Sequence, residues 1–113
     1  MNPGRELDAL VAEKVIGILV TFEQGDYWPP ARQGANFSTQ PIKEYSTDIA
    51  AAWEVAEKLE KHGWDVIVSP GSNHGGAWCE LSSIEEKYNA RAYTAPHAIC
   101  LAALKACGVE VQT

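Results

Sequence analysis

The segment that most constrains the fold lies near the C-terminus, where apolar residues leave almost no polar face. Residues 95–107 read APHAICLAALKAC. Thr94 is a suitable N-cap, Pro96 suits a first turn, and Gly108 suits a C-terminal stop, so the pattern predicts a helix over Ala95–Cys107. A helix that is apolar nearly all round must be largely buried. The rest of the chain therefore has to supply the elements that cover it.

A first helix is predicted at the N-terminus. Asn2 can serve as its N-cap, Pro3 suits the first helical position, and Gly17 suits the end. The apolar residues between them recur at helical spacing and form one stripe, which consists of Leu7, Leu10, Val11 and Val15. This stripe also needs a partner to cover it.

A second helix is predicted between Ser46, a suitable N-cap, and Gly63, a suitable C-terminal stop. Its apolar stripe consists of Ile49, Ala52, Trp53, Ala56 and Leu59. Trp53 is therefore predicted to be a core residue.

Short β-prone runs separate the helices and predict strands at residues 18–22, 64–68, 77–82 and 89–93. At least one of Trp64 and Trp78 is expected in the core. Consecutive strands with hairpin-length connections indicate an antiparallel sheet. We therefore expect one α/β (α+β) domain over residues 1–113: about three to five antiparallel strands with helices packed on one or both faces, in an α-β-α sandwich-like arrangement.

Residues 23–44 differ from the rest of the chain, because they hold three prolines and two glycines but few aliphatic side chains. Unstructured loops of this length are uncommon in compact domains and are often functional. The segment is either such a loop or a short edge hairpin around Tyr27–Trp28 and Ile42.

Three blocks of the sequence resemble a known family. They are RELDALVAEKVIG at Arg5–Gly17, EYSTDIAAAWEVAEKLEKHGW at Glu44–Trp64, and ARAYTAPHAICLAALKACGVEV at Ala90–Val111. Together they cover about half of the chain and look like the small phage and prophage proteins of the phage ABA sandwich domain family. The resemblance implies a sheet sandwiched between helices and a phage or prophage protein acting in the cytoplasm of a bacterial host. It transfers no catalytic residue.

Composition narrows the partners further. The chain has 113 residues and a net charge of −6, which disfavours duplex nucleic acid and anionic membrane surfaces. The N-terminus has no apolar secretory region, and no apolar run is long enough to span a bilayer. Three cysteines without CxxC spacing fit a reducing compartment, and we expect them to be small buried residues.

No catalytic or metal-binding motif stands out. The three histidines lack helical metal spacing, and neither HExxH nor CxxC occurs. We therefore expect a protein that is not an enzyme and has no cofactor or bound metal. The glycine-rich stretch at residues 71–76 is either a plain hairpin loop or an anion site in which amides act beside Asn73 and His74.

The sequence favours a binding function. One hypothesis is a counter-defence sponge: a homo-oligomer that sequesters a small nucleotide immune signal in pockets built from loops. Aromatic rings would stack on the base and cations with loop polar groups would hold phosphate; the candidate residues are Tyr27, Trp28, Arg32, Lys43, Asn73, His74 and Arg91. Trp28 could equally tuck the loop onto the sheet. The alternative hypothesis is an inhibitor or accessory factor that acts on a host protein.

Overall fold

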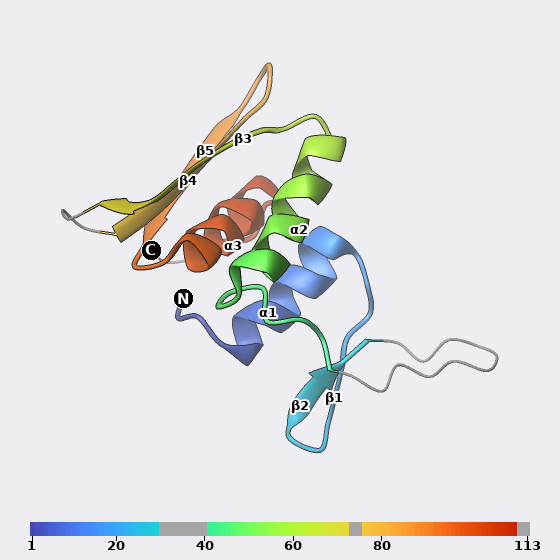
Figure 1. Cartoon of the computed structure of the whole chain (residues 1–113). Coiled ribbons are helices and arrows are strands. Elements are labelled where there is room, and N and C mark those ends of the chain that lie inside the picture. Colours follow the sequence, from blue (N-terminus) through green and yellow to red (C-terminus); the bar gives the residue numbers. More distant parts are fainter. Residues whose placement is uncertain (30–40, 73–75, 111–113) are drawn as a thin grey trace.

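The computed structural model describes residues 1–29, 41–72 and 76–110 and places its helices on one side of a three-stranded sheet (Figure 1). The helices are α1 (Arg5–Val11), which continues into a π-helical turn η1 (Ala12–Ile16), α2 (Ile49–Lys61) and α3 (Ala95–Ala106). The strands are β1 (Thr21–Glu23), β2 (Asp26–Trp28), β3 (Asp65–Ser72), β4 (Gly76–Ser82) and β5 (Lys87–Ala92). The predicted fold class, antiparallel strands with helices packed on them, is confirmed.

The main sheet has the order β3-β4-β5, and both pairs are antiparallel. Residues alternate in burial along β4: Ala77, Cys79 and Leu81 are buried beneath the helices, while Trp78 and Glu80 are only half-buried. Such alternation is typical of a sheet that has a helix layer on one side only.

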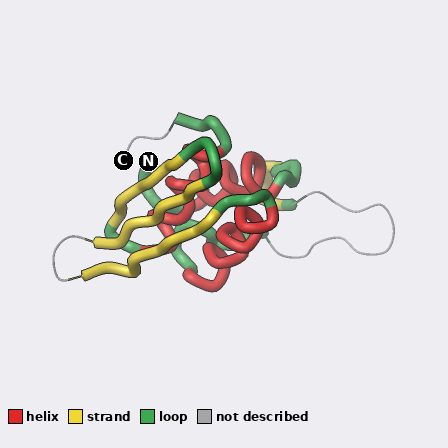
Figure 2. Tube along the Cα trace, turned by 90° about the horizontal axis from the view of Figure 1, so that it is seen from above, coloured by secondary structure: helices red, strands yellow, loops and turns green. Residues whose placement is uncertain are grey.

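No described helix lies over the other face of the sheet (Figures 1 and 2). We call it the open face; it carries Asp65, Ile67, Ser69, Trp78, Glu80, Ser82, Lys87, Asn89 and Arg91.

Neither Trp64 nor Trp78 is a buried core residue, contrary to the prediction that at least one of them would be. Trp64 is half-buried at the margin of the core and meets the edge of Tyr88, with ring centroids 5.8 Å apart. Trp78 lies on the open face because the neighbouring Ala77 and Cys79 point toward the helices.

Helix α3 is the centre of the core, as its apolar sequence predicts. It packs on all three strands of the sheet and on α1 and α2, and its residues from Ala98 to Leu104 are at most 1% exposed. The predicted N-cap is confirmed, because the Thr94 Oγ1 accepts a hydrogen bond from the His97 backbone N–H at 3.4 Å.

The N-cap of helix α2 lies two residues later than predicted. Asp48 is the N-cap, and its carboxylate accepts a hydrogen bond from the Ala50 backbone N–H at 3.0 Å. Ser46 is instead fully buried, where it binds Asp8. The prediction of Ser46 as the cap was therefore wrong, because its hydroxyl has a tertiary partner.

The buried stripe of α2 is also rotated from the predicted one. It consists of Ala51, Ala52, Val55, Ala56 and Leu59, whereas Ile49 is 51% and Trp53 49% exposed. The core position predicted for Trp53 is wrong. Small side chains of α2 face α3 and let the two helices pack closely. The large Trp53 indole therefore lies at the margin of this contact.

Helix α1 begins at Arg5 after Gly4, not after Asn2 as predicted. Residues before Gly4 extend toward α3, where the Met1 carbonyl oxygen lies 2.7 Å from the His97 Nε2. Gly17 ends the helical segment with a positive φ of 89°, as its sequence position predicts.

The described part of residues 23–44 contains a short hairpin, but not the one predicted around Tyr27–Trp28 and Ile42: β2 pairs with β1, Ile42 is not in a strand, and residues 30–40 lie outside the described residues. Strands β1 and β2 are joined at Gln24–Gly25, where both residues have positive φ, as in the turns that suit two-residue hairpins. The Ile42 backbone N–H donates to the Tyr27 carbonyl at 3.0 Å. The hairpin lies on the far side of the helices and does not contact the three-stranded sheet (Figure 1).

Candidate functional site

The strongest candidate site is a hollow of about 240 Å³ on the open face. Four side chains from two adjacent strands line it: Trp78 and Glu80 from β4, and Asn89 and Arg91 from β5. Trp78 lies directly opposite Arg91 in the strand register, and Glu80 lies opposite Asn89. Regular strands hold these positions because Ala77, Cys79 and Leu81 of β4 and Ala90 of β5 are buried in the core.

The charged groups of this hollow differ in their bonding. Arg91 makes no hydrogen bond or ion pair with any described residue. The Glu80 Oε1 lies 3.7 Å from the Lys87 Nζ, a loose pair at the edge of the hollow. The indole can stack on a planar ring, the amide can form hydrogen bonds with the polar edge of that ring, and the unpaired guanidinium can bind an anion.

Arg91 is the predicted ligand-binding residue that lies in this hollow. Tyr27 and Trp28 lie in the hairpin instead. The Tyr27 ring packs toward the core and meets the Phe22 ring with centroids 4.9 Å apart. The Trp28 indole N–H donates to the Glu23 carbonyl at 3.0 Å, so it closes the hairpin on itself.

Lys43 also lies away from Arg91, beside the start of α2. Its Nζ donates to both carboxylate oxygens of Glu54 at 2.7 Å. The hydrogen bonds to Glu54 raise the pKa of Lys43, and the Glu54 carboxylate neutralises the Lys43 charge. A hollow of about 320 Å³ nearby is lined by Lys43 and three acids, Glu44, Asp48 and Glu54, and so disfavours an anionic ligand.

The remaining predicted residues, Arg32, Asn73 and His74, lie outside the described residues. Because the hairpin and the three-stranded sheet do not touch, one chain does not bring Tyr27, Trp28 and Arg91 together in a single site. The predicted pocket, which the homo-oligomer hypothesis could also place between two copies of the chain, therefore stays a prediction.

Sequence reasoning missed Trp78, Glu80 and Asn89 as site residues. The signal was present in the two-residue period of β4 and β5. Ala77, Cys79 and Leu81 form an apolar series, which requires the residues between them to point outward.

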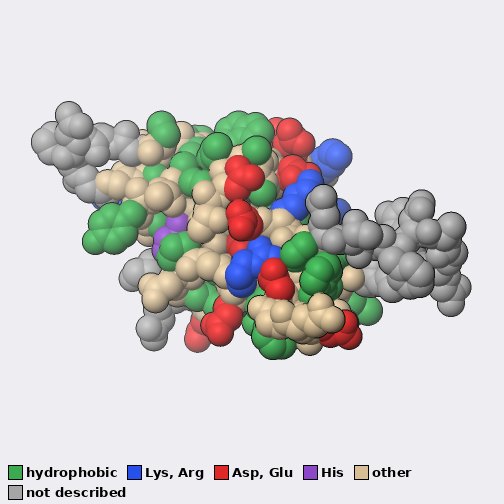
Figure 3. All heavy atoms as spheres, turned by 60° about the horizontal axis from the view of Figure 1, so that its bottom comes forward, with side chains coloured by type: hydrophobic (Ala, Val, Ile, Leu, Met, Phe, Trp, Pro, Cys, Tyr) green, Lys and Arg blue, Asp and Glu red, His purple; other side chains and the backbone are tan. Residues whose placement is uncertain are grey.

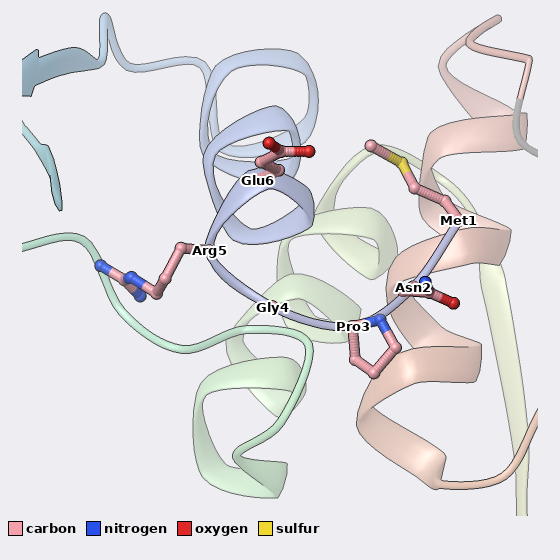
Figure 4. Close-up of a pocket in the computed structure, with 6 residues that line it drawn as sticks. All are labelled: Met1, Asn2, Pro3, Gly4, Arg5 and Glu6. Carbon is pink, nitrogen blue, oxygen red and sulfur yellow. The ribbon is translucent and has the colours of Figure 1, made fainter. Parts of the chain in front are cut away.

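A further hollow of about 300 Å³ is lined by residues 1–6 (Figure 4). Arg5 points away from it, toward the segment before α2, where its Nη2 donates to the Ile42 carbonyl at 2.8 Å. The same guanidinium binds Asp26 at 2.8 Å and Asp8 at 3.0 Å. Arg5 therefore joins α1 to the hairpin and is not free to bind a ligand.

The cysteines divide by burial. Cys79 and Cys100 are fully buried, as expected, but Cys107 is exposed, contrary to the prediction. Burial raises the pKa of Cys79 to about 12 and also raises that of Cys100. Both thiols are therefore protonated and poorly nucleophilic at neutral pH. In the part of the chain that the structure describes, no three His, Cys, Asp or Glu residues gather as metal ligands.

Acidic and basic side chains are intermixed on the side of the molecule that Figure 3 shows. The described Lys and Arg residues there form small groups among the acids, not one extended basic surface. None of the helices within residues 1–29, 41–72 and 76–110 combines the length and apolar character that a bilayer crossing requires.

Comparisons with known proteins agree with this architecture. Residues 9–104 match the family model described as phage ABA sandwich domain. A solved structure of a phage protein from Bacillus cereus ATCC 14579 is 28% identical and superposes with a TM-score of 0.73. The match covers 99% of this chain and 93% of that one. No curated protein matches the chain.

Proposed function

The chain belongs to the phage ABA sandwich domain family, and on that premise we propose that this phage protein is a non-enzymatic sponge. It would bind a small nucleotide that signals infection in the bacterial host and thereby counter host defence. The observation that carries the proposal is the hollow on the open face, where the Trp78 indole and the unpaired Arg91 guanidinium lie on directly paired strand positions.

The chemistry of the hollow fits a nucleotide better than it fits a plain anion. An indole gives a stacking surface for a base, and stacking contributes about 1–3 kcal/mol per base. Asn89 can donate and accept hydrogen bonds at a base edge, and Arg91 can bind a phosphate with two parallel hydrogen bonds. Glu80 opposes a highly charged ligand, which favours a mononucleotide or cyclic nucleotide over a polyphosphate.

A role in sequestration, not turnover, is supported by the chemistry of the lining. None of the four residues is a cysteine, serine or histidine, and Glu80, the one lining side chain that could act as a base or nucleophile, is paired with Lys87 at 3.7 Å. An open hollow on one face also leaves most of a ligand exposed. Tight retention would need a further surface to close over it.

Isothermal titration calorimetry against cyclic mononucleotides, cyclic dinucleotides and ADP-ribose derivatives tests the proposal. We expect at least one of them to bind, and Arg91→Gln to weaken that binding roughly 10–100-fold, the loss of one charge-assisted interaction. Lys14→Gln is the matched control, because it removes one positive charge from an exposed position of η1 away from the open face. Absence of binding by every nucleotide, or equal losses in both variants, would overturn the proposal.

A second candidate function, inhibition of a host protein, is supported by a different surface. Ile49 and Trp53 lie one turn apart on α2 and each exposes about half of its side chain, at 51% and 49%. Exposed aromatic and aliphatic side chains anchor protein interfaces. Loss of a host partner with Trp53→Ala, and no loss with Arg91→Gln, would favour this function over the sponge.

A further inference from the structure

The open face has a charge distribution that can pair with itself. Its acids are Asp65 on β3 and Glu80 on β4, and its bases are Lys87 and Arg91 on β5. The face is therefore neutral and polarised across the strands, whereas the whole chain carries −6. Two copies of an acidic chain repel each other least through such a neutral surface.

The face also carries apolar area that a partner could cover. Ile67 is 50% exposed, and the neighbouring Trp78 is only half-buried. Each of them lies beside a charged residue on the adjacent strand: Ile67 is opposite Glu80, and Trp78 is opposite Arg91. No described helix of the same chain lies over this area (Figure 2).

We infer that the open face binds the open face of a second copy of this chain. A two-fold axis in the interface and parallel to β4 places β3 of one copy over β5 of the other. Asp65 then faces Lys87 of the second copy, twice per dimer, and the two Trp78 side chains approach each other on the axis. The two Glu80 side chains also meet on the axis, where the Lys87 Nζ of the same chain, 3.7 Å from each carboxylate, offsets their repulsion. Face-to-face sheets with nearly aligned strands are a standard packing arrangement.

The dimer should be concentration-dependent. Three strands of up to eight residues cover roughly 26 by 14 Å at ordinary strand spacing. This area is smaller than the ~800 Å² per partner of a standard interface. Sedimentation of the unliganded chain should therefore show a shift from monomer to dimer as its concentration rises. Because the experiment contains no nucleotide, its result does not depend on the proposed function.

Charge reversal gives a specific test. Asp65→Lys places two lysines against each other across the interface, and Lys87→Glu places two acids there, so each variant alone should be monomeric. A 1:1 mixture of the two variants restores opposite charges at both contacts and should form a heterodimer. The controls Glu13→Lys and Lys14→Glu make the same charge changes at exposed positions of η1 and should dimerise like the original chain.

Three outcomes would overturn the inference. They are a monomer at the highest soluble concentration, a dimer that both face variants leave intact, and single variants that stay monomeric when mixed. Circular dichroism of each variant checks that the fold is retained.

Discussion

The Asp8 carboxylate accepts a hydrogen bond from the Ser46 hydroxyl at 2.5 Å, and both side chains are almost completely buried. The same carboxylate oxygen accepts from the Ser46 backbone N–H at 2.8 Å. The other oxygen binds Arg5 at 3.0 Å, and the Ser46 Oγ accepts from the Gly4 N–H at 2.9 Å. This cluster fastens α1 to the segment that leads into α2.

Ser46→Ala should destabilise the chain by about 1–3 kcal/mol, because the Gly4 N–H loses its acceptor and the buried Asp8 carboxylate loses one of its hydrogen bonds. Thermal or urea unfolding measures the change. The adjacent Thr47 is exposed, so Thr47→Ala is a matched loss of one hydroxyl and should change stability by less than about 0.5 kcal/mol. Equal effects in the two variants would contradict a structural role for the cluster.

Asp48→Ala should cost about 1 kcal/mol of stability, because it removes the acceptor for the Ala50 N–H at the start of α2. Asn2→Ala should be neutral, since Gly4 and not Asn2 precedes α1. Urea unfolding of the two variants distinguishes the caps found in the structure from the cap predicted at Asn2. The reverse order of stability would be inconsistent with the structure.

Attachment of the hairpin should weaken in acid. The Tyr27 backbone N–H, and then the Arg5 guanidinium, lower the pKa of Asp26. A carboxylate with a lowered pKa contributes its stabilisation above the pKa of the unfolded chain and loses it as the pH falls through the lower folded value. The Tyr27 amide resonance should therefore shift with pH below about 4, the ordinary range of an Asp carboxyl. Asp26→Asn should abolish that shift, and a transition that persists in this variant would belong to another group.

Native-state alkylation should label Cys107 first. Its thiol is exposed, whereas Cys79 and Cys100 are fully buried and burial raises the pKa of Cys79 to about 12. Mass spectrometry after a short iodoacetamide pulse at pH 8 should find one modified cysteine, and all three after denaturation. Early labelling of Cys79 would show that the sheet and α3 separate readily.

The elements with local signals could be predicted from the sequence. Thr94, Pro96 and the apolar run after them define α3 without reference to the rest of the chain. The buried positions of α2 could not be predicted as well, because alanine and tryptophan can occupy the same stripe on a helical wheel. Which of them faces α3 depends on how closely the two helices approach.

The candidate site was less predictable than the fold. Tyr27 and Trp28 attract attention because aromatic residues stand out in a segment with few aliphatics, but their hydrogen bond and ring contacts serve the hairpin itself. Trp78 and Asn89 have no such local signal. Only the register between β4 and β5 brings them to the same hollow as Arg91.

The helical layer that separates the β1–β2 hairpin from the three-stranded sheet lets the two parts of the chain evolve separately. Substitutions in the hairpin need no compensating change in the three-stranded sheet. The sheet can in turn change in sequence without disturbing the hairpin. A phage lineage under changing selection from its hosts could therefore remodel either end by a few point mutations and keep one shared scaffold.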